Sequence, residues 1–329
     1  MNQILKTSEV TATRLIGNTP AIGRIRERIR QVARNDLSVL LVGETGVGKE
    51  LVARAIHQAA EQTGDRTGRL VIVDCPNIPR GQADAFLFGQ IAGAFAGTEP
   101  AVEGPFQLGD GGTVFLDGID ELPDHLQAKL LRILDQREVV PLGSPRAIPI
   151  DVRVIAAVRA RPSALRSATD LRADLYHRVC ETIIEIPPLR TRKPDIALLA
   201  EHFLAELGAS QQLSDTARLA LERCAWPGNV RELRSVVRRA ALLHPELSIL
   251  GPECLFEAPP GDGQRDVDLG RLLDCSWDRA KDEFARWYWT NVWQSYAGDR
   301  RRIAEHARVS DVWLRSRRKL YELQDGGSA

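Results

Sequence analysis

Short apolar runs alternate along residues 1–187 with longer stretches in which apolar residues recur every three or four positions. The short runs are rich in β-branched residues and most of them end at glycine, proline or aspartate, which is typical of buried strands. They occupy residues 37–42, 70–73, 114–117, 152–158 and 183–186. Helical spacing is found in residues 16–36, 51–57 and 126–136. This alternation predicts an α/β fold with a parallel sheet covered by helices on both faces.

The pattern changes after Pro187 and Pro188, where strand-like runs stop and only helical spacing remains. Residues 194–207, 214–225 and 229–243 predict a small helical domain. A segment rich in proline, glycine and charge predicts a linker. The resulting division is a loose tail over 1–15, an α/β subdomain over 16–187, a helical subdomain over 188–258, a linker over 259–268 and a second helical domain over 269–329.

Composition narrows the class of protein. The chain has 329 residues, 43% of them hydrophobic and 27% charged, with a formal net charge of +0, which is typical of a soluble globular protein with no overall field favouring nucleic acid or membranes. No apolar stretch approaches the roughly 20 residues of a membrane span, and no export signal precedes residue 15. The five cysteines are scattered without a metal-binding spacing. We therefore expect a cytoplasmic protein without a membrane partner.

A glycine-rich loop joins the first predicted strand to the helix that follows it. Its backbone N–H groups, the positive end of that helix and one lysine would surround a phosphate group. An ordinary glycine-rich turn is the alternative, but the lysine and both flanking elements favour a nucleoside triphosphate site. The residues of this expected site are Gly43, Glu44, Thr45, Gly46, Val47, Gly48, Lys49 and Glu50.

A second nucleotide motif ends the third predicted strand at Asp117. A carboxylate in that place can hold Mg²⁺ beside the phosphates. The alternative is that Asp117 only begins a turn. Hydrolysis also needs a group that orients the attacking water, and the next residue, Gly118, has no side chain. Loss of a positioned base costs on the order of 10²–10⁴ in rate.

These motifs and the segments around them resemble the AAA+ domain of bacterial enhancer-binding proteins, the activators of sigma-54 RNA polymerase. Residues 87–89 (LFG), 171–178 (LRADLYHR), 186–190 (IPPLR) and 226–233 (WPGNVREL) match signatures of that family. The family's GAFTGA loop, which contacts the sigma factor, corresponds to Gly93, Ala94, Phe95, Ala96, Gly97 and Thr98. The similarity covers residues 16–323.

The resemblance implies an AAA+ P-loop sheet with a helical lid that binds ATP and Mg²⁺ and assembles as a hexamer-type ring. Arg172 and Arg178 match an arginine pair that reaches the γ-phosphate of a neighbouring subunit, and Arg231 matches a lid arginine that senses the same group. A planar guanidinium suits that role because it binds two phosphate oxygens at once. For each arginine, a local salt bridge is the alternative.

Four departures from the family pattern bear on ATP use. Gly118 replaces the family's glutamate, Asp74 replaces the asparagine that holds that glutamate, and Val158-Arg159 replaces a Thr-Asn pair. Ala96 replaces the prominent threonine of the sigma-contact loop. These substitutions predict that ATP is bound but hydrolysed slowly or not at all, so enzymatic turnover is uncertain.

The C-terminal region has the apolar pattern of a helix-turn-helix and a local excess of basic residues. It resembles the Fis-type helix-turn-helix domain at the C-terminus of most enhancer-binding proteins. Arg308 occupies a position in the turn where that family usually has glycine. A solvated basic helix is the alternative. Tryptophans before it recur at helical steps and are expected in the core or a dimer face rather than on a base-stacking surface. The expected DNA-binding residues are Ser310, Arg315, Arg317, Arg318 and Lys319.

Three functions are therefore compared. The leading hypothesis is a DNA-bound regulator of the sigma-54 activator type without an N-terminal sensory domain. It either activates RNA polymerase holoenzyme weakly through the altered loop, or is a non-remodelling regulator that joins the ring of a competent paralogue and supplies Arg172 and Arg178 there. The alternatives are a fully competent sigma-54 activator and a non-transcriptional AAA+ remodelling ATPase. A kinase or small GTPase is disfavoured because no second-substrate or base-specificity motif is present.

Overall fold

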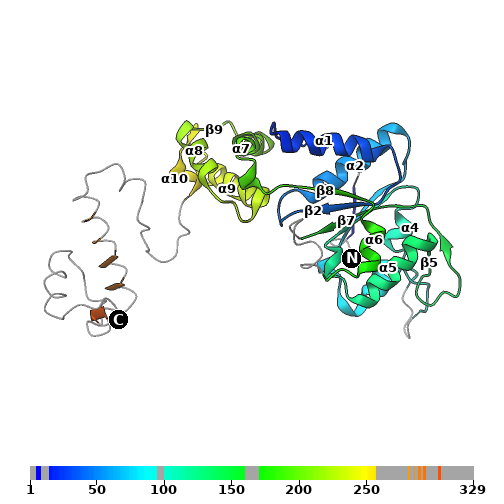
Figure 1. Cartoon of the computed structure of the whole chain (residues 1–329). Coiled ribbons are helices and arrows are strands. Elements are labelled where there is room, and N and C mark those ends of the chain that lie inside the picture. Colours follow the sequence, from blue (N-terminus) through cyan, green and yellow to red (C-terminus); the bar gives the residue numbers. More distant parts are fainter. Residues whose placement is uncertain are drawn as a thin grey trace. The chain divides into compact units, whose positions relative to one another are not determined.

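The computed structural model describes residues 5–8, 15–94, 100–159 and 170–256 and, in the C-terminal region, Lys281, Ala285, Tyr288, Trp289, Val292, Trp293, Ile303 and Ala304. The chain divides into two compact units, Met1–Glu257 and Ala258–Ala329, which are described separately. The first unit contains the sheet and the helical subdomain that follows it in sequence (Figure 1).

A six-stranded sheet forms the centre of the first unit, with the strand order β1-β3-β4-β7-β2-β8. Its strands are β1 (Leu5–Ser8), β2 (Val39–Val42), β3 (Leu70–Asp74), β4 (Thr113–Asp117), β7 (Arg153–Val158) and β8 (Thr182–Glu185). Every neighbouring pair is parallel except β1 with β3. The predicted parallel α/β sheet is confirmed, and each predicted strand lies within two residues of its expected position.

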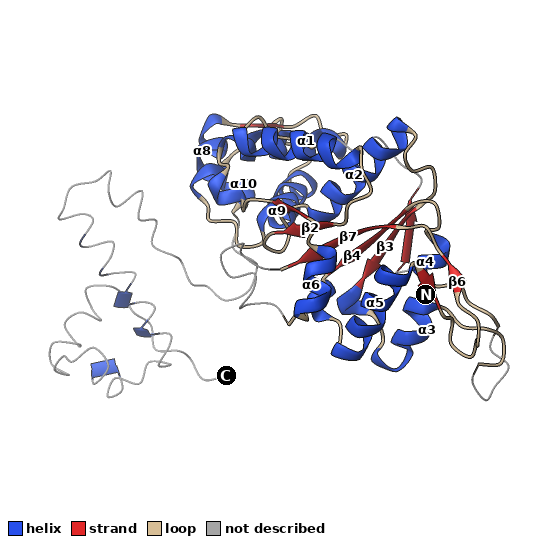
Figure 2. Cartoon of the chain, turned by 45° about the vertical axis from the view of Figure 1, so that its right-hand side comes forward, coloured by secondary structure: helices blue, strands red, loops and turns tan. Residues whose placement is uncertain are grey.

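Helices cover both faces of this sheet, as Figure 2 shows. On one face lie α1 (Pro20–Ala33) and α2 (Lys49–Thr63). On the other lie α3 (Ala83–Phe88), α4 (Pro105–Leu108), α5 (Asp124–Gln136) and α6 (Ala173–Val179). Each face of the sheet has its own hydrophobic core, and alternate strand residues point into one or the other. Leu41 and Phe115 pack with α1 and α2, whereas Leu40 and Leu116 pack with α3–α6. This alternation is the period of two that a doubly covered strand requires.

Short 3₁₀ turns and two-residue strands complete the sheet subdomain. The turns are η1 (Cys75–Asn77), η2 (Arg80–Gln82), η3 (Ile119–Glu121) and η5 (Leu189–Thr191). The strands β5 (Glu138–Val139) and β6 (Ile148–Pro149) pair antiparallel in a separate sheet. The turn η3 follows β4 after Gly118 and carries the carboxylates of Asp120 and Glu121.

The N-terminal segment differs from the expected loose tail. Residues Leu5–Ser8 pair antiparallel with β3, from Leu5 opposite Val73 to Ser8 opposite Leu70. Four residues are too few for a periodic apolar pattern, and an edge strand is stabilised mainly by backbone hydrogen bonds to its neighbour. The prediction of an unstructured tail is therefore wrong for these residues.

The helical subdomain predicted after residue 187 is present. Its helices are α7 (Pro194–Glu206), α8 (Asp215–Arg223), α9 (Asn229–Leu243) and α10 (Pro252–Leu255), and its short strands β9 (Gln212–Leu213) and β10 (Ile249–Leu250) pair parallel. Its own core gathers Leu199, Leu233 and Val237 around Trp226, whose indole Nε1 donates to the Leu221 carbonyl at 2.8 Å. The side chain of Ser214 caps α8 by accepting from the Ala217 N–H.

In the second unit, Trp289, Val292, Trp293 and Ile303 form one buried apolar cluster. The prediction that these tryptophans belong to a core is therefore confirmed for Trp289 and Trp293. The predicted DNA-binding residues Ser310, Arg315, Arg317, Arg318 and Lys319, and Phe95, Ala96, Gly97 and Thr98 of the predicted sigma-contact loop, lie outside the described residues. Within the described part of the chain, no helix is long and apolar enough to cross a bilayer.

Candidate functional site

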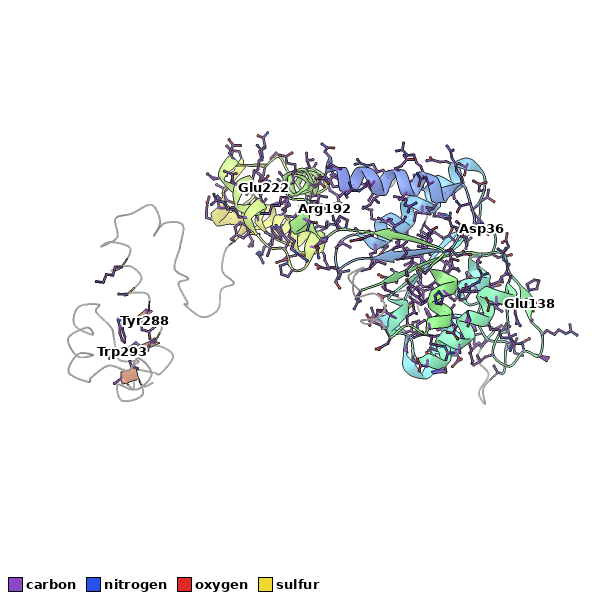
Figure 3. The ribbon with its side chains drawn as sticks, in the orientation of Figure 1. Asp36, Glu138, Arg192, Glu222, Tyr288 and Trp293 are labelled. Carbon is purple, nitrogen blue, oxygen red and sulfur yellow. The ribbon has the colours of Figure 1, made fainter. Side chains whose placement is uncertain are left out.

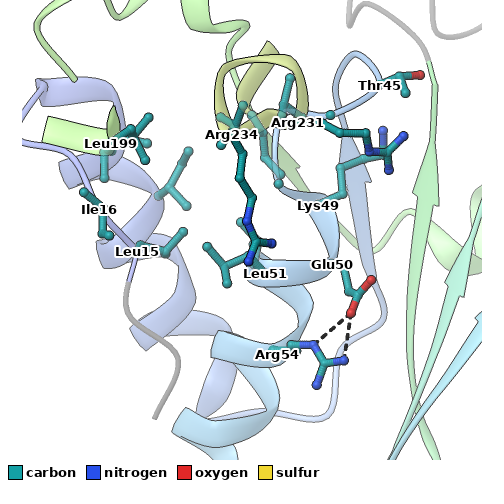
Figure 4. A pocket seen from close by; sticks show the side chains of 18 of the residues that line it. Leu15, Ile16, Thr45, Lys49, Glu50, Leu51, Arg54, Leu199, Arg231 and Arg234 are labelled. Atoms are coloured by element: carbon teal, nitrogen blue, oxygen red, sulfur yellow. Dashed lines mark hydrogen bonds and ion pairs between the residues drawn. The ribbon is translucent and has the colours of Figure 1, made fainter. Parts of the chain in front are cut away.

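A cleft of about 440 Å³ lies between the glycine-rich loop, the start of α2 and the helical subdomain. Figure 4 shows Thr45 and Lys49 from the loop on one wall and Arg231 and Arg234 from α9 beside them. Among the predicted site residues, those that line the cleft are Thr45, Gly46, Val47, Gly48, Lys49, Glu50, Asp117 and Arg231. The structure thus brings together the two predicted nucleotide motifs and the predicted lid arginine.

The glycine-rich loop has the curled backbone that phosphate binding requires. Gly46 and Gly48 adopt φ angles of 78° and 104°, a region that favours glycine. Helix α2 begins at Lys49, whose Nζ donates to the carbonyl oxygens of Gly43 and Glu44 at 2.8 and 3.2 Å. Burial lowers the pKa of Lys49, and the nearby Asp117 carboxylate opposes that shift. A buried ammonium group at a helix N-terminus is well placed for a phosphate.

Asp117 ends β4 and faces the cleft beside Lys49. Burial raises the pKa of its carboxyl group, while the charge of Lys49 lowers it. Within the described ranges no cluster of three His, Cys, Asp or Glu side chains is placed to hold a metal. Mg²⁺ in nucleotide sites needs only one or two carboxylates because phosphates and water complete its shell. Asp117 therefore fits Mg²⁺ bound together with a nucleotide.

The glycine-rich loop is tied to the helical subdomain through Glu44. Arg190 forms a bidentate ion pair with this carboxylate, donating from Nη1 to Oε2 at 2.7 Å and from Nη2 to Oε1 at 2.6 Å. Asn229 donates from Nδ2 to the Thr45 carbonyl at 3.0 Å and accepts from the Leu189 N–H at 2.8 Å. The Glu44 side chain therefore connects loop and lid, while its carbonyl accepts from Lys49.

The backbones of loop and lid also touch at Gly46. A Cβ at this position would lie 2.2 Å from the Gly228 carbonyl oxygen, so no larger residue fits. The Arg231 N–H donates to the Gly46 carbonyl at 3.3 Å. The loop and the start of α9 are therefore in direct backbone contact.

The other end of the cleft is apolar and is lined by residues from the segment 15–25, from the end of β8, from α7 and from α9. They are Leu15, Ile16, Ile22, Ile25, Ile186, Leu199, Phe203 and Val230. An apolar slot beside a cationic phosphate site is suited to a planar base. Leu15 and Ile16 precede α1, and Figure 4 shows them on the same side of the pocket as Leu199.

The segment before α1 is held in place by Asp195 of α7, which is fully buried. Its carboxylate accepts from the N–H groups of Asn18 and Thr19 at 2.7 and 3.0 Å and from the Thr19 hydroxyl at 2.6 Å. The nearby Arg192, labelled in Figure 3, donates from Nη2 to the Val47 carbonyl at 3.1 Å. Burial lowers the pKa of the Arg192 guanidinium, and the charge of Asp195 raises it. Asp195 therefore fixes the apolar wall and compensates a buried cation.

Gly118 follows Asp117 with φ 75° and ψ 44°. A Cβ on this residue would lie 3.0 Å from Cγ and from Cδ of Pro76. A side chain here therefore meets both backbone strain, of about 1–2 kcal/mol for a left-handed L-residue, and a rigid ring. The position that the family pattern fills with glutamate has a local backbone suited to glycine.

Of the predicted trans arginines, Arg172 immediately precedes α6 and Arg178 lies on it, and neither lines the cleft. Arg172 pairs with Asp174, with Nη2 to Oδ2 at 2.8 Å and Nε to Oδ1 at 3.1 Å. Arg178 donates from Nη2 to the Leu134 carbonyl at 2.8 Å, and its Nε lies 3.2 Å from Asp135 Oδ1. Their proposed action on a neighbouring subunit stays a prediction.

The described residues on either side of the predicted sigma-contact loop are hydrogen-bonded to each other. Gln90 and Val102 exchange N–H···O=C hydrogen bonds at 2.9 Å, and the Ile91 N–H donates to the Leu142 carbonyl at 3.0 Å. Gly93 has a φ of 74°, and Ala94 lies against Gly143. Residues 90 and 102 are thus bonded to each other, and residues 91–94 contact the segment over 140–144.

Two family models match the chain: the sigma-54 interaction domain over residues 15–185 and the AAA+ ATPase lid domain over residues 190–260. The first alone spans more than half of the chain. The chain belongs to the sigma-54 interaction domain family. The match to this family corresponds to the sheet subdomain, and the lid match corresponds to the helical subdomain that closes the cleft.

Several relatives in the sigma-54 interaction domain family are transcription regulators. The anaerobic nitric oxide reductase transcription regulator NorR of Salmonella typhimurium is 41% identical over 254 residues, covering 76% of this chain and 49% of the relative. The C4-dicarboxylate transport transcriptional regulatory protein DctD of Rhizobium meliloti is 41% identical over 235 residues, covering 69% and 50%. The chain therefore spans about half the length of the curated relatives it matches.

Solved structures of NtrX from Brucella abortus share the architecture. The complex with ADP superposes with a TM-score of 0.68 at 25% identity, covering 94% of this chain and 69% of NtrX. The complex with ATP gives a TM-score of 0.67 at 25% identity, covering 95% and 70%. The AAA+ sheet and lid predicted from the sequence are therefore confirmed.

Sequence reasoning located the phosphate end of the cleft but assigned no role to several residues that shape it. Arg190 and Asn229 stand inside recognised motifs, so a motif-level signal was available for them. Nothing local marked the apolar slot or the Asp195 clamp, because their partners are more than 170 residues away in sequence. The residues missed in this way are Leu15, Ile16, Ile25, Arg192, Asp195, Leu199 and Phe203.

Proposed function

We propose that the chain is an ATP- and Mg²⁺-binding, DNA-binding transcription regulator of the sigma-54-dependent type that hydrolyses ATP slowly. Family membership supports the regulatory class. The observation that carries the proposal is the cleft in which Lys49, Asp117 and Arg231 surround a phosphate-sized space while the adjoining Gly118 carries no side chain. Such a site retains the groups for binding and lacks a positioned base.

ATPases of this class form rings, and a nucleotide that is bound but slowly hydrolysed can stabilise such a ring. ATP held by Lys49 would stabilise the assembly, and Arg172 and Arg178 would act on the nucleotide of a neighbouring subunit. The ring would consist of copies of this chain or include a competent paralogue. The alanine at position 96 would alter the contact with the sigma factor, since it has no hydroxyl group.

We expect steady-state ATP turnover of the purified full chain to be at least 10²-fold below that of a competent family member, because the base is missing. Mixing the two proteins should preserve or raise the partner's turnover. The substitutions Gly118→Glu and Ala96→Thr should raise output from a sigma-54-dependent promoter. Addition of Pro76→Ala should increase the gain, since it removes the ring that a side chain at 118 would meet.

Two results would contradict this account. Turnover at the level of a competent relative, abolished by Lys49→Ala, would show that Gly118 is no defect. Absence of any gain in the triple variant, at equal protein abundance, would show that the altered residues do not limit output.

A remodelling ATPase unconnected with transcription is the second candidate, and DNA binding separates the two. A DNA-binding domain that contacts six or more phosphates is expected to lose about 10³-fold or more in DNA affinity between 50 and 200 mM salt. Fluorescence anisotropy with duplex DNA measures this, and replacement of Arg315 and Arg318 by alanine should flatten the salt dependence. If the full chain binds no DNA even at low salt, the remodelling ATPase is favoured.

A further inference from the structure

An ion pair joins the ends of two neighbouring strands at the phosphate end of the cleft. Arg159 Nη1 lies 2.7 Å from Glu121 Oε1. Arg159 directly follows β7, and Glu121 ends η3, which follows β4. Because β4 and β7 are paired, with Asp117 opposite Ala157, the two segments meet although they are distant in sequence. Burial raises the pKa of the neighbouring Asp120 carboxyl group, and the backbone of Arg159 opposes that shift.

Arg159 is a cation of the cleft as well as a partner of Glu121. It lines the cleft together with Lys49 and Asp117. Its charge lowers the pKa of both of those groups, which places the guanidinium within electrostatic range of the phosphate site. Glu121 does not line the cleft. The arginine therefore lies between a carboxylate behind it and the space that phosphates would occupy.

The pair is partly open to solvent, with 45% of the Arg159 side chain and 38% of the Glu121 side chain exposed. Ion pairs this exposed are weak, whereas a phosphoryl group binds a guanidinium through several charged oxygens. Arg159 can thus exchange one acceptor for a stronger one.

We propose that Arg159 selects ATP over ADP by exchanging Glu121 for the γ-phosphate, with Glu121 acting as an intramolecular competitor for the same guanidinium. This inference rests on the proposed nucleotide site. ADP leaves the ion pair intact because it has no γ-phosphate. The two partners therefore have opposite effects on ATP affinity, which a purely structural salt bridge would not produce.

The test is calorimetric titration of the full chain with Mg²⁺ and either ATPγS or ADP. Arg159→Ala should weaken ATPγS binding about tenfold or more, as expected for a lost hydrogen bond between charged groups, and change ADP binding less than twofold. Glu121→Gln should strengthen ATPγS binding about two- to fivefold and leave ADP binding unchanged. ADP affinity also reports that each variant is folded.

Arg218→Ala is the matched control. Arg218 pairs with Glu201 at 3.0 Å with similar exposure, 40% and 44%, and does not line the cleft, so neither affinity should change. Equal losses of ATPγS and ADP in Arg159→Ala would overturn the inference, as would weaker ATPγS binding in Glu121→Gln. Failure of the unaltered chain to bind either nucleotide would overturn this inference and the proposed function together.

Discussion

Replacement of Lys49 by alanine is expected to weaken ATP binding by about 100-fold or more. Lys49 is the ammonium group at the N-terminus of α2, it is 7% exposed, and it faces the space between Asp117 and the glycine-rich loop. Removal of one partner of a buried charge pair costs about 2–5 kcal/mol. The loss should fall on the nucleotide complex, since in the free protein Lys49 is a buried cation whose burial disfavours its charge.

Thermal unfolding with and without Mg-ATP measures this effect. A ligand that binds only the folded state stabilises it by RT ln(1 + [L]/Kd). At an ATP concentration well below the Kd of Lys49→Ala the shift should therefore disappear, while the midpoint of the free variant stays close to that of the unaltered chain. Lys129→Ala is the control, because Lys129 is a half-exposed lysine of α5 paired with Asp84. An ATP-induced shift of undiminished size in Lys49→Ala would place the nucleotide elsewhere.

Replacement of Asp195 by alanine is expected to lower the free energy of unfolding of the first unit by about 3–5 kcal/mol. The fully buried carboxylate accepts hydrogen bonds from the Asn18 N–H and from the N–H and hydroxyl of Thr19. Its loss leaves these donors without their acceptor and leaves the buried Arg192 without its compensating charge. Nucleotide affinity should also fall, because the segment carrying Leu15 and Ile16 would lose its anchor.

Chemical denaturation followed by circular dichroism measures the first effect, and nucleotide titration measures the second. Asp215→Ala is the matched control, since that carboxylate begins α8 with its side chain 93% exposed, and it should change stability by about 0.5 kcal/mol or less. Asp195→Asn should fall between the two because an amide oxygen still accepts. A loss below about 1 kcal/mol in Asp195→Ala would show that the clamp contributes little.

The predicted strands and helices agree with the structure wherever a long apolar pattern or a contiguous motif carried them. The glycine-rich loop was identifiable because its strand, loop and helix are consecutive, so the chemistry and its context occur in one stretch. The strand Leu5–Ser8 escaped because an edge strand of four residues depends on its partner β3 rather than on its own pattern. The helical spacing over 16–36 corresponds to a helix at Pro20–Ala33, and Asp195 accepts from the N–H groups of Asn18 and Thr19 just before that helix begins.

Gly118 shows the difference between a motif and its geometry. The sequence identified it as a missing side chain and predicted that glutamate would restore activity. The structure adds a left-handed backbone and the ring of Pro76, which lies 3.0 Å from the point that a Cβ would occupy, so a second change at Pro76 should increase the effect of the restoring substitution. A backbone dihedral depends on neighbouring segments as well as on the residue, and only the fold supplies those neighbours.

By itself the sequence determined the alternation of strands and helices, the phosphate-binding loop ending at Lys49 and the lid with Arg231, because each is encoded within a contiguous stretch. The tertiary structure decided which distant groups meet: Arg190 with Glu44, Asp195 with Thr19, and Arg159 with Glu121. Such pairs follow from strand order and from the docking of the lid on the sheet. Local periodicity carries no information on either, since it reports which face of an element is buried and not what covers it.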